Sequence, residues 1–470
     1  MSDEQKGFHD IVKKYIEDVP YIKSGDNIKE LEIRFSNGKS RITKIDYDNV
    51  CRKLLSLGFK PNKNEGKYLL RISNEYTDRS TGRTKISNIR TEINNLDNVK
   101  EYCKTNKLPD DNRAYNYVQK SQAKDKNGAP LFPYDVKSYN LRLSYSLETN
   151  INKTSKLAQS INESWSDSKK VFRYINRVSF THENFPLTVD CSIVKSSPRK
   201  GKYLLPTYTV QEADLFNNPE TYEIEIEVDN SKMEGVNTND LEKKLMGCIK
   251  FVLSGLQQTN YPVSYVEIDN IGKEYLKLIK NNSNYLKSNT FIGPNSFTLQ
   301  MENIVEKNTD NNIPNIRSGY TVTDKADGLR KLLYISNKGL IYLINTNMNI
   351  EFTGSRCDNN NYYNSLIDGE HISHNKRDEF INLYAAFDVY YIKNVDVRNK
   401  AFVKKDTESK ESVRLNLLSE LVGNIALKGV TNKEKPPIRI EIKNFYTSQG
   451  DITIFAACKQ ILDRVKNNGF

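Results

Sequence analysis

The sequence predicts an α+β protein in which an antiparallel β-barrel with a charged interior is followed by a second α+β domain. Two observations lead to this prediction. In the first half, many short segments alternate apolar with charged residues, as strands do when one face is buried and the other is polar. In the second half, a short run of Lys, Asp, Gly and Arg at 323–331 precedes several hydrophobic strands. At 470 residues the chain exceeds one ordinary domain, and we expect two, covering 1–230 and 231–470.

Charge and cysteine usage narrow the classes of protein that fit. The net charge of +11 and the pI of about 9.0 favour a polyanionic partner such as RNA or a nucleotide. The six cysteines include no C-x-x-C pair and the four histidines form no ligand pattern, which argues against a zinc cluster or a disulfide framework. The sequence shows neither a signal peptide nor an apolar run of the roughly 18 residues that a membrane span needs, so we expect a cytoplasmic protein.

Two of the predicted strands carry a row of glutamates on one face. The glutamates are Glu30 and Glu32 in segment 28–35, and Glu223, Glu225 and Glu227 in segment 221–229. Carboxylates that are adjacent on one face repel one another, and a divalent cation would neutralise them. Two such strands at opposite ends of one domain could close on a single metal ion. For the first strand alone, an ordinary amphipathic strand with a solvated face is the simpler interpretation.

Between the glutamate strands, several predicted strands present basic residues on one face. We expect these strands to form a barrel whose lumen has glutamates on one wall and basic residues on the others, which suits a metal ion and a triphosphate. The candidates are Arg71, Arg90, Arg142, Arg177 and Lys195, with Asp190 on the same strand as Lys195. For each single basic residue, a solvated surface charge is an equally good interpretation.

This pattern resembles the triphosphate tunnel metalloenzymes, specifically the metal-dependent RNA 5′-triphosphatases, over roughly residues 20–230. The resemblance implies that Mg²⁺ or Mn²⁺ is held by Glu30, Glu32, Glu223, Glu225 and Glu227. It also implies catalytic roles for Arg177 and Asp190. Phosphate contacts would come from Arg71, Arg90, Arg142 and Lys195.

The second half is organised around the stretch T-D-K-A-D-G-L-R-K at 323–331. A neutral Lys325 amine could attack the α-phosphorus of a nucleoside triphosphate, with Asp327 on the same side of an extended segment. Gly328 allows a tight backbone path beside phosphate, and Arg330 can hold ribose or phosphate through its planar fork. The alternative is a charged surface turn, since the chain has 70 Lys and Arg residues.

The segments that follow strengthen the nucleotide interpretation. Hydrophobic strands are predicted at 332–336, 341–344, 365–372 and 384–392. In the third, the apolar run leads into Asp368-Gly369-Glu370. Their order and spacing resemble motifs I, III and IIIa of the covalent nucleotidyltransferases, the mRNA guanylyltransferases and polynucleotide ligases. The resemblance implies a lysyl-GMP intermediate on Lys325. It implies GTP binding by Asp327, Gly328, Arg330, Asp368, Glu370, Phe387 and Asp388, with Phe387 packing on the base and Asp388 near the metal.

Taken together, the two halves resemble the large-DNA-virus type of mRNA capping enzyme. The implied partners are 5′-triphosphate RNA and GTP, together with a methyltransferase domain or subunit, in the host cytoplasm or the virion. The implied activity is hydrolysis of the RNA γ-phosphate, followed by GMP transfer to the diphosphate end. In guanylyltransferases an acidic-Gly-Leu-Ile strand, a Lys-x-Lys motif and an oligonucleotide-binding fold come next and would follow Phe470. We therefore expect either a fragment of a longer polypeptide or an incomplete transferase.

Two other classes of protein stay open. A polynucleotide ligase shares the lysine motif, but it would react with ATP or NAD and would not need the glutamate barrel. A non-catalytic RNA-binding or partner-binding protein could derive from a transferase that has lost its activity. The intact set around Lys325 and Glu370 argues against such a loss, while the missing carboxy-terminal motifs argue for it.

Overall fold

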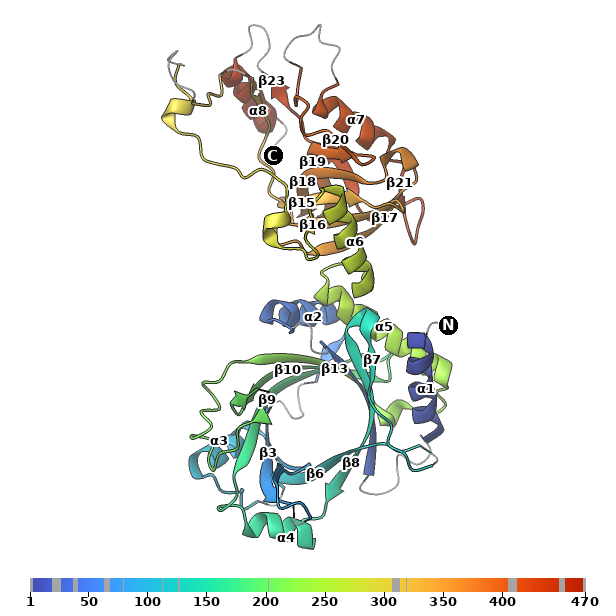
Figure 1. Cartoon of the computed structure of the whole chain (residues 1–470), viewed down its shortest axis with the longest axis vertical. Coiled ribbons are helices and arrows are strands. Elements are labelled where there is room, and N and C mark those ends of the chain that lie inside the picture. The colour runs from blue at the N-terminus through green and yellow to red at the C-terminus, as the bar shows by residue number, and fades with distance from the viewer. Residues whose placement is uncertain are drawn as a thin grey trace. The chain divides into compact units, whose positions relative to one another are not determined.

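The computed structural model describes residues 3–18, 27–36, 41–62, 68–78, 80–111, 113–125, 127–201, 203–306, 313–317, 319–404, 412–447 and 453–467. The chain forms two compact units, 1–258 and 259–470 (Figure 1). The sequence-based division after residue 230 falls before helix α5 (Thr238–Leu256), which packs within the first unit. The packing is close, because a Cβ added to Gly255 would lie 2.7 Å from the Cα of Val50 in helix α2 (Lys44–Ser56).

Eight strands of the first unit close into an antiparallel barrel, as the sequence predicted. Their order around the barrel is β9–β10–β13–β1–β8–β6–β5–β3, and β3 pairs again with β9 (Figure 1). The strands are β1 (Asn27–Phe35), β3 (Tyr68–Thr77), β5 (Ile89–Asn94), β6 (Tyr115–Gln122), β8 (Leu141–Ile151), β9 (Lys170–Thr181), β10 (Leu187–Ser196) and β13 (Thr221–Val228). The first and last of these strands in the sequence are therefore neighbours in space.

Alternation along each strand gives the barrel an apolar outer side and a polar inner side. Leu70, Ile72 and Phe172 pack outward in a buried cluster with Tyr102 and Trp165. Helices α3 (Leu96–Thr105) and α4 (Lys156–Glu163) contribute to this cluster, and α1 (Asp3–Asp18) packs on α5. Short strands extend the sheet or form a separate hairpin, namely β2 (Lys60–Pro61), β4 (Thr84–Ile86), β7 (Tyr134–Val136), β11 (Arg199–Lys200) and β12 (Tyr203–Leu204).

The second unit contains a sheet in the order β20–β19–β18–β15–β16–β17–β21, with β22 parallel to β19. The strands are β15 (Leu329–Ile335), β16 (Leu340–Asn345), β17 (Ile350–Cys357), β18 (Ser365–His374), β19 (Phe380–Ile392), β20 (Val395–Asp396), β21 (Leu427–Gly429) and β22 (Arg439–Ile442). A separate pair, β14 (Thr321–Val322) and β23 (Tyr446–Thr447), packs against helix α8 (Ile454–Asn467).

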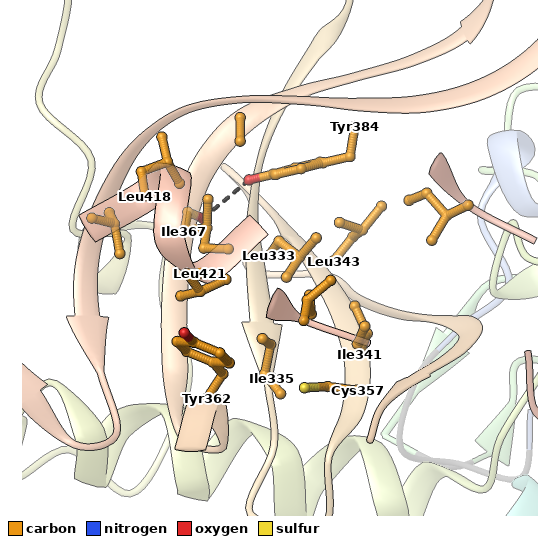
Figure 2. Packing of buried hydrophobic residues seen from close by; sticks show 14 of the residues in the cluster. Leu333, Ile335, Ile341, Leu343, Cys357, Tyr362, Ile367, Tyr384, Leu418 and Leu421 are labelled. Carbon is orange, nitrogen blue, oxygen red and sulfur yellow. Dashed lines mark hydrogen bonds between the residues drawn. The ribbon is translucent and has the colours of Figure 1, made fainter. Parts of the chain in front are cut away.

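Both faces of this sheet are covered, which explains its nearly continuous hydrophobic strands. On one face, Leu333 and Ile367 pack with Leu418 and Leu421 of helix α7 (Arg414–Asn424) (Figure 2). On the other face, Leu332 packs in a cluster with residues of α6 (Tyr265–Leu278). The fully buried Tyr384 hydroxyl lies 3.0 Å from the carbonyl of Ile367 and 2.8 Å from that of Lys331, so its polar atom is satisfied.

Two further properties bear on the expectations from composition. Within the described residues, no helix is both long enough and apolar enough to cross a bilayer. All six cysteines are free thiols.

Candidate active sites

The barrel brings the two predicted rows of glutamates side by side. Strand β1 pairs with β13, so that Glu32 lies opposite Glu227. Strand β10 pairs with the other edge of β13, so that Asp190 lies opposite Glu225. The even-numbered residues of β1 and β10 and the odd-numbered residues of β13 therefore share the inner face. This register builds an acidic wall from three adjacent strands.

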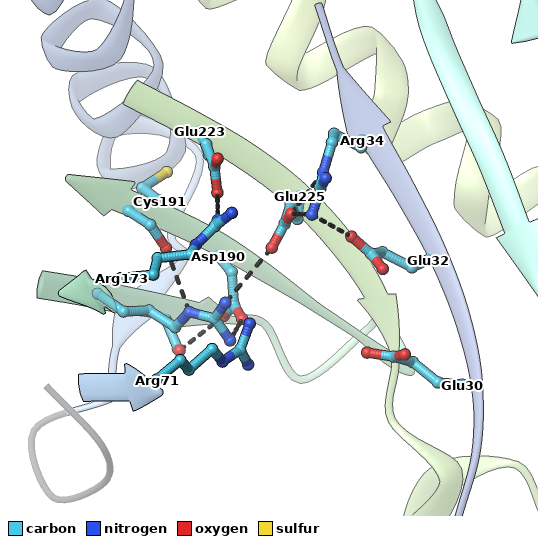
Figure 3. Close-up of polar contacts among 12 residues, drawn as sticks. Glu30, Glu32, Arg34, Arg71, Arg173, Asp190, Cys191, Glu223 and Glu225 are labelled. Carbon is cyan, nitrogen blue, oxygen red and sulfur yellow. Dashed lines mark hydrogen bonds and ion pairs between the residues drawn. The ribbon is translucent and has the colours of Figure 1, made fainter. Parts of the chain in front are cut away.

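Two arginines form ion pairs with carboxylates of this wall. Arg34 donates from Nε to Glu225 Oε1 at 2.7 Å and from Nη2 to Glu32 at 3.3 Å (Figure 3). Arg177 lies 2.6 Å from Asp190 and 3.4 Å from Glu225. Burial opposes ionisation of Glu225, but Arg34 and Arg177 outweigh burial and lower the pKa of Glu225 to about 2. Glu225 is therefore a firmly charged carboxylate inside the barrel.

Lys120 of β6 contacts both glutamates of β1, Glu30 and Glu32. Its Nζ lies 2.5 Å from Glu30 Oε2 and 3.0 Å from Glu32 Oε2. The next ion pairs continue through β8, β5 and β3. Their distances are 2.7 Å for Arg90–Glu148, 2.6 Å for Arg90–Glu92 and 2.8 Å for Arg71–Glu92. Acidic and basic side chains of all eight strands thus line the lumen, and we call this set the ion-pair belt.

The acidic wall carries more negative charge than its arginines and lysine offset. Burial first, and then Glu30 and Asp190, raise the pKa of Glu227 to about 8. Burial and Glu225 raise the pKa of Glu32 to about 7. Within the described residues, no three His, Cys, Asp or Glu side chains are already arranged as a metal site. The unmet charge nevertheless fits an additional cation, because carboxylate oxygens are the ligands that Mg²⁺ prefers.

The strands that adjoin the acidic wall on one side, β9 and β3, carry surplus positive charge. Arg173 of β9 pairs with Glu223 (Figure 3), yet its Nε is buried without a hydrogen-bond partner. Burial lowers the pKa of Arg71, and the nearby Arg90, Arg177 and Arg173 add to that effect. A buried donor without an acceptor, among mutually repelling guanidiniums, suits an anionic ligand.

Two predicted phosphate-binding residues lie outside the ion-pair belt. Arg142 pairs with Asp135 at 2.7 Å, and both side chains are more than 40% exposed. Lys195 donates to the Phe216 carbonyl at 2.5 Å and lies 3.8 Å from Glu220. The odd separation of Lys195 from Asp190 places the two side chains on opposite faces of β10.

The sequence interpretation did not single out several members of the belt. Lys120 lies on a strand whose outward tyrosines, Tyr115 and Tyr117, belong to the outer core. Their alternation was the available signal, since it places Lys120 on the inner face. Glu92 and Glu148 were also not singled out, whereas Arg34 and Arg173 were placed on the polar strand faces from the sequence without an assigned role.

In the second unit, Arg330 and Asp368 form a buried ion pair at the centre of the predicted nucleotide site. The Arg330 Nη2 lies 2.5 Å from Asp368 Oδ2, and the Asp368 side chain is 0% exposed. The guanidinium lies between two rings, 5.5 Å from the centroid of Phe291 and 5.8 Å from that of Phe387. It also donates to the carbonyl of Pro294 at 2.5 Å. Arg330 therefore positions the segments around it, in addition to any contact with a ligand.

Lys325, by contrast, is an exposed side chain. Its Nζ lies 3.4 Å from Asp327 Oδ1, and the two side chains are 86% and 87% exposed. Gly328 follows in close contact with β18, because an added Cβ would lie 3.0 Å from the His371 carbonyl. Glu370, opposite Arg330 in β18, has a buried Oε2 without a hydrogen-bond partner, and burial raises its pKa. That unpaired oxygen is available to a ligand hydroxyl.

Asp388, which the sequence predicts to lie near a metal ion, pairs with an arginine of a later helix. Arg414 Nε donates to its Oδ1 at 2.8 Å and Nη2 to its Oδ2 at 3.1 Å. Arg414 begins helix α7, so this pair anchors the helix to β19. The structure places Phe387, the preceding residue, against Arg330.

Comparison with known proteins bears on this arrangement of Lys325, Asp368 and Glu370. Residues 259–466 match the protein family described as "mRNA capping enzyme, catalytic domain". This match spans nearly the whole of the second unit, which is therefore similar to the capping-enzyme catalytic domain. A probable mRNA-capping enzyme of Acanthamoeba polyphaga mimivirus is 30% identical over 281 residues, which are 59% of this chain. The chain spans 20% of the length of that capping enzyme.

Among solved structures, the chain is similar to triphosphatases that include the two described next. The mimivirus capping enzyme triphosphatase aligns with a TM-score of 0.34 and 15% identity, covering 54% of this chain and 98% of that one. The S. pombe Pct1 RNA triphosphatase aligns with a TM-score of 0.29 and 14% identity, covering 58% of this chain and 92% of that one.

Proposed function

We propose that the first unit is an RNA 5′-triphosphatase and that the second transfers GMP, so that the chain carries the first two steps of mRNA capping. The ion-pair belt is the observation that carries the first assignment. Burying so many ionised groups in one lumen is costly, and replacing buried ion pairs by apolar residues is often neutral or stabilising. A charged lumen with an acidic wall and a guanidinium wall is therefore best explained by a charged ligand.

The acidic wall would hold Mg²⁺ or Mn²⁺ through Glu30, Glu32, Glu225 and Glu227, with Glu223 beside them. These residues fit a divalent cation, since Glu32 and Glu227 have raised pKa values that an added positive charge would lower. When bound, the ion would supply Lewis-acid stabilisation of charge on the phosphoryl oxygens.

The chain's own residues would bind and orient the triphosphate. Arg71, Arg173 and Arg177 lie on β3 and β9, beside the glutamates of the acidic wall, and would donate to phosphate oxygens. Their positive charge would offset the negative charge that develops on the phosphate oxygens as the bond between the γ-phosphorus and its bridging oxygen breaks. A lumen glutamate would orient the attacking water, and the products are 5′-diphosphate RNA and inorganic phosphate.

In the second unit, Lys325 Nζ would attack the α-phosphorus of GTP. A P–N bond forms, the bond to the β-phosphate oxygen breaks, and pyrophosphate leaves. The terminal phosphate of the diphosphate RNA would then displace the lysine and take the GMP. Asp327, Gly328 and Glu370 would contact the nucleotide, while Arg330 and Asp368 would position Phe387 beside it. The family match over residues 259–466 supports this assignment.

Two assays on one protein preparation test the proposal. The first measures inorganic phosphate released from 5′-triphosphate RNA, with and without Mg²⁺ or Mn²⁺. We expect metal-dependent release that Glu32→Ala abolishes and Lys325→Ala preserves. The second measures covalent labelling of the protein by α-labelled GTP and by α-labelled ATP. We expect labelling by GTP alone, lost in Lys325→Ala. Labelling by ATP alone would indicate a ligase, and unchanged phosphate release in Glu32→Ala would refute the barrel assignment.

A further inference from the structure

We propose that Lys120 couples the binding of the divalent cation to the binding of the triphosphate. In the metal-free barrel its ammonium holds Glu30 and Glu32. When a cation takes those two carboxylates, the ammonium turns to the phosphates. This inference rests on the proposed triphosphatase function and adds to it a residue that makes the two ligands bind cooperatively.

The first observation is that Lys120 occupies the same oxygens that a cation would need. Its Nζ lies 2.5 Å from Glu30 Oε2 and 3.0 Å from Glu32 Oε2. Both carboxylates are mostly buried, with side-chain exposures of 13% and 8%. A divalent ion on these oxygens would stand at close range to the ammonium, and two like charges at that distance repel strongly in a poorly solvated site. Lys120 and the cation therefore compete for the β1 glutamates.

The second observation is that, among the residues that the structure describes, no further ion-pair partner of Lys120 is free of another cation. The remaining partner in reach is Glu148, whose Oε1 lies 3.9 Å from Nζ. Arg90 already holds that same oxygen at 2.7 Å. The Lys120 side chain is 33% exposed, so water offsets part of the loss of its counter-ions, and another anion would restore the remainder. A triphosphate in the lumen would supply that anion.

The third observation is the identity of the residue. The other basic side chains that we assign to the ion-pair belt are arginines, whose planar forks hold fixed carboxylate partners, whereas Lys120 is a point charge on a flexible stem. It can exchange one partner for another by rotating its stem. Cation and triphosphate should consequently each strengthen the binding of the other, by the same factor in both directions.

The test is a titration of the full chain with Mn²⁺, in which the paramagnetic resonance signal reports the free ion. It is run with and without an imido-bridged tripolyphosphate that water does not cleave. The same titrations without protein give the Mn²⁺ that the analogue binds by itself. In the wild type, the analogue should tighten Mn²⁺ binding about tenfold, within the usual range of coupling between sites. Lys120→Met should bind Mn²⁺ more tightly than the wild type when the analogue is absent, and the coupling factor should fall towards one.

Lys195→Met is the matched control, because Lys195 lies outside the ion-pair belt and is paired with the Phe216 carbonyl. It should keep the wild-type affinity and coupling. If Lys120→Met does not fold, Lys120→Gln removes the same charge while keeping a polar side chain. Unchanged coupling in a folded Lys120 variant, beside metal-dependent phosphate release by the wild type, would overturn the role of Lys120 alone. A wild type that neither binds Mn²⁺ nor releases phosphate would overturn the triphosphatase assignment as well.

Discussion

Arg34 and Glu225 join the first and last strands of the barrel, with the Arg34 Nε 2.7 Å from Glu225 Oε1. The same guanidinium reaches Glu32 on its own strand. Because the Glu225 side chain is 9% exposed and that of Arg34 is 46% exposed, the arginine reaches from partly solvated space to a buried carboxylate. The contact fixes the spacing between the two glutamate rows.

Removing this guanidinium should cost stability and phosphate release together. Arg34→Met leaves Glu225 paired with Arg177 at 3.4 Å. We expect a loss of about 2 kcal/mol in the free energy of unfolding, typical of a hydrogen bond to a buried charged group. Urea denaturation measures it. Arg142→Met is the control, because its exposed pair with Asp135 should contribute less than about 1 kcal/mol. Equal losses in the two variants would contradict the role of Arg34.

The acidic wall should make the metal-free barrel less stable as pH rises. The pKa values of Glu32 and Glu227 are raised to about 7 and about 8 from an ordinary value of 4.5. The unfolded chain therefore loses these protons first, and the stability that protonation gives is present below about pH 4.5 and is lost by about pH 8.

Thermal unfolding in the presence of a chelator, across this pH range, measures the decline. Glu227→Gln cannot ionise, so its melting temperature should fall less above pH 7 than that of the wild type. Mn²⁺ should reduce the decline in the wild type, because it binds the deprotonated carboxylates. A melting temperature that rises between pH 5 and pH 8 in the wild type would contradict the raised pKa values.

The sequence was sufficient for the barrel and for the pairing of its glutamate rows. Alternation at period two assigned the inner face of β1 and β13, and closure of the barrel made those strands neighbours. It was not sufficient for Lys195, whose position relative to Asp190 places it on the outer face. Lys120 was missed because its importance arises from contacts between strands far apart in the sequence, which a single segment does not show.

In the second unit, the motif residues were located by spacing, but their partners were not. Asp388 was expected near a metal ion, whereas the structure pairs it with Arg414, a residue of a later helix. Arg330 was expected to hold ribose or phosphate, and the structure shows it held between Phe291 and Phe387. Long side chains such as arginine reach partners that sequence spacing cannot identify.

A methyl group at Gly328 should impair nucleotide transfer. In Gly328→Ala the new Cβ would lie 3.0 Å from the His371 carbonyl and 3.2 Å from Glu370 Cβ, so the backbone beside β18 must give by a few tenths of an ångström. We expect less covalent labelling by GTP, with the barrel's phosphate release unchanged. Gly423→Ala is the control, since its Cβ meets nothing within 4 Å and it lies within α7. That variant should be neutral or more stable by up to about 1 kcal/mol. Full labelling by Gly328→Ala would show that the strands tolerate the shift.

Asp388→Asn separates a structural role from a role in the reaction. The substitution keeps the shape of the side chain but removes the charge that Arg414 holds through two hydrogen bonds. We expect a loss of about 2 kcal/mol in the free energy of unfolding of the second unit, since hydrogen bonds between charged groups are of that order. Arg414→Gln should give a similar loss, and the double variant should lose less than the sum, because each change removes the same pair. In each folded variant, labelling by GTP should keep the wild-type dependence on metal concentration. A different outcome would assign Asp388 to the metal. In it, Asp388→Asn would keep its stability and need a higher metal concentration for labelling by GTP, whereas Arg414→Gln would not.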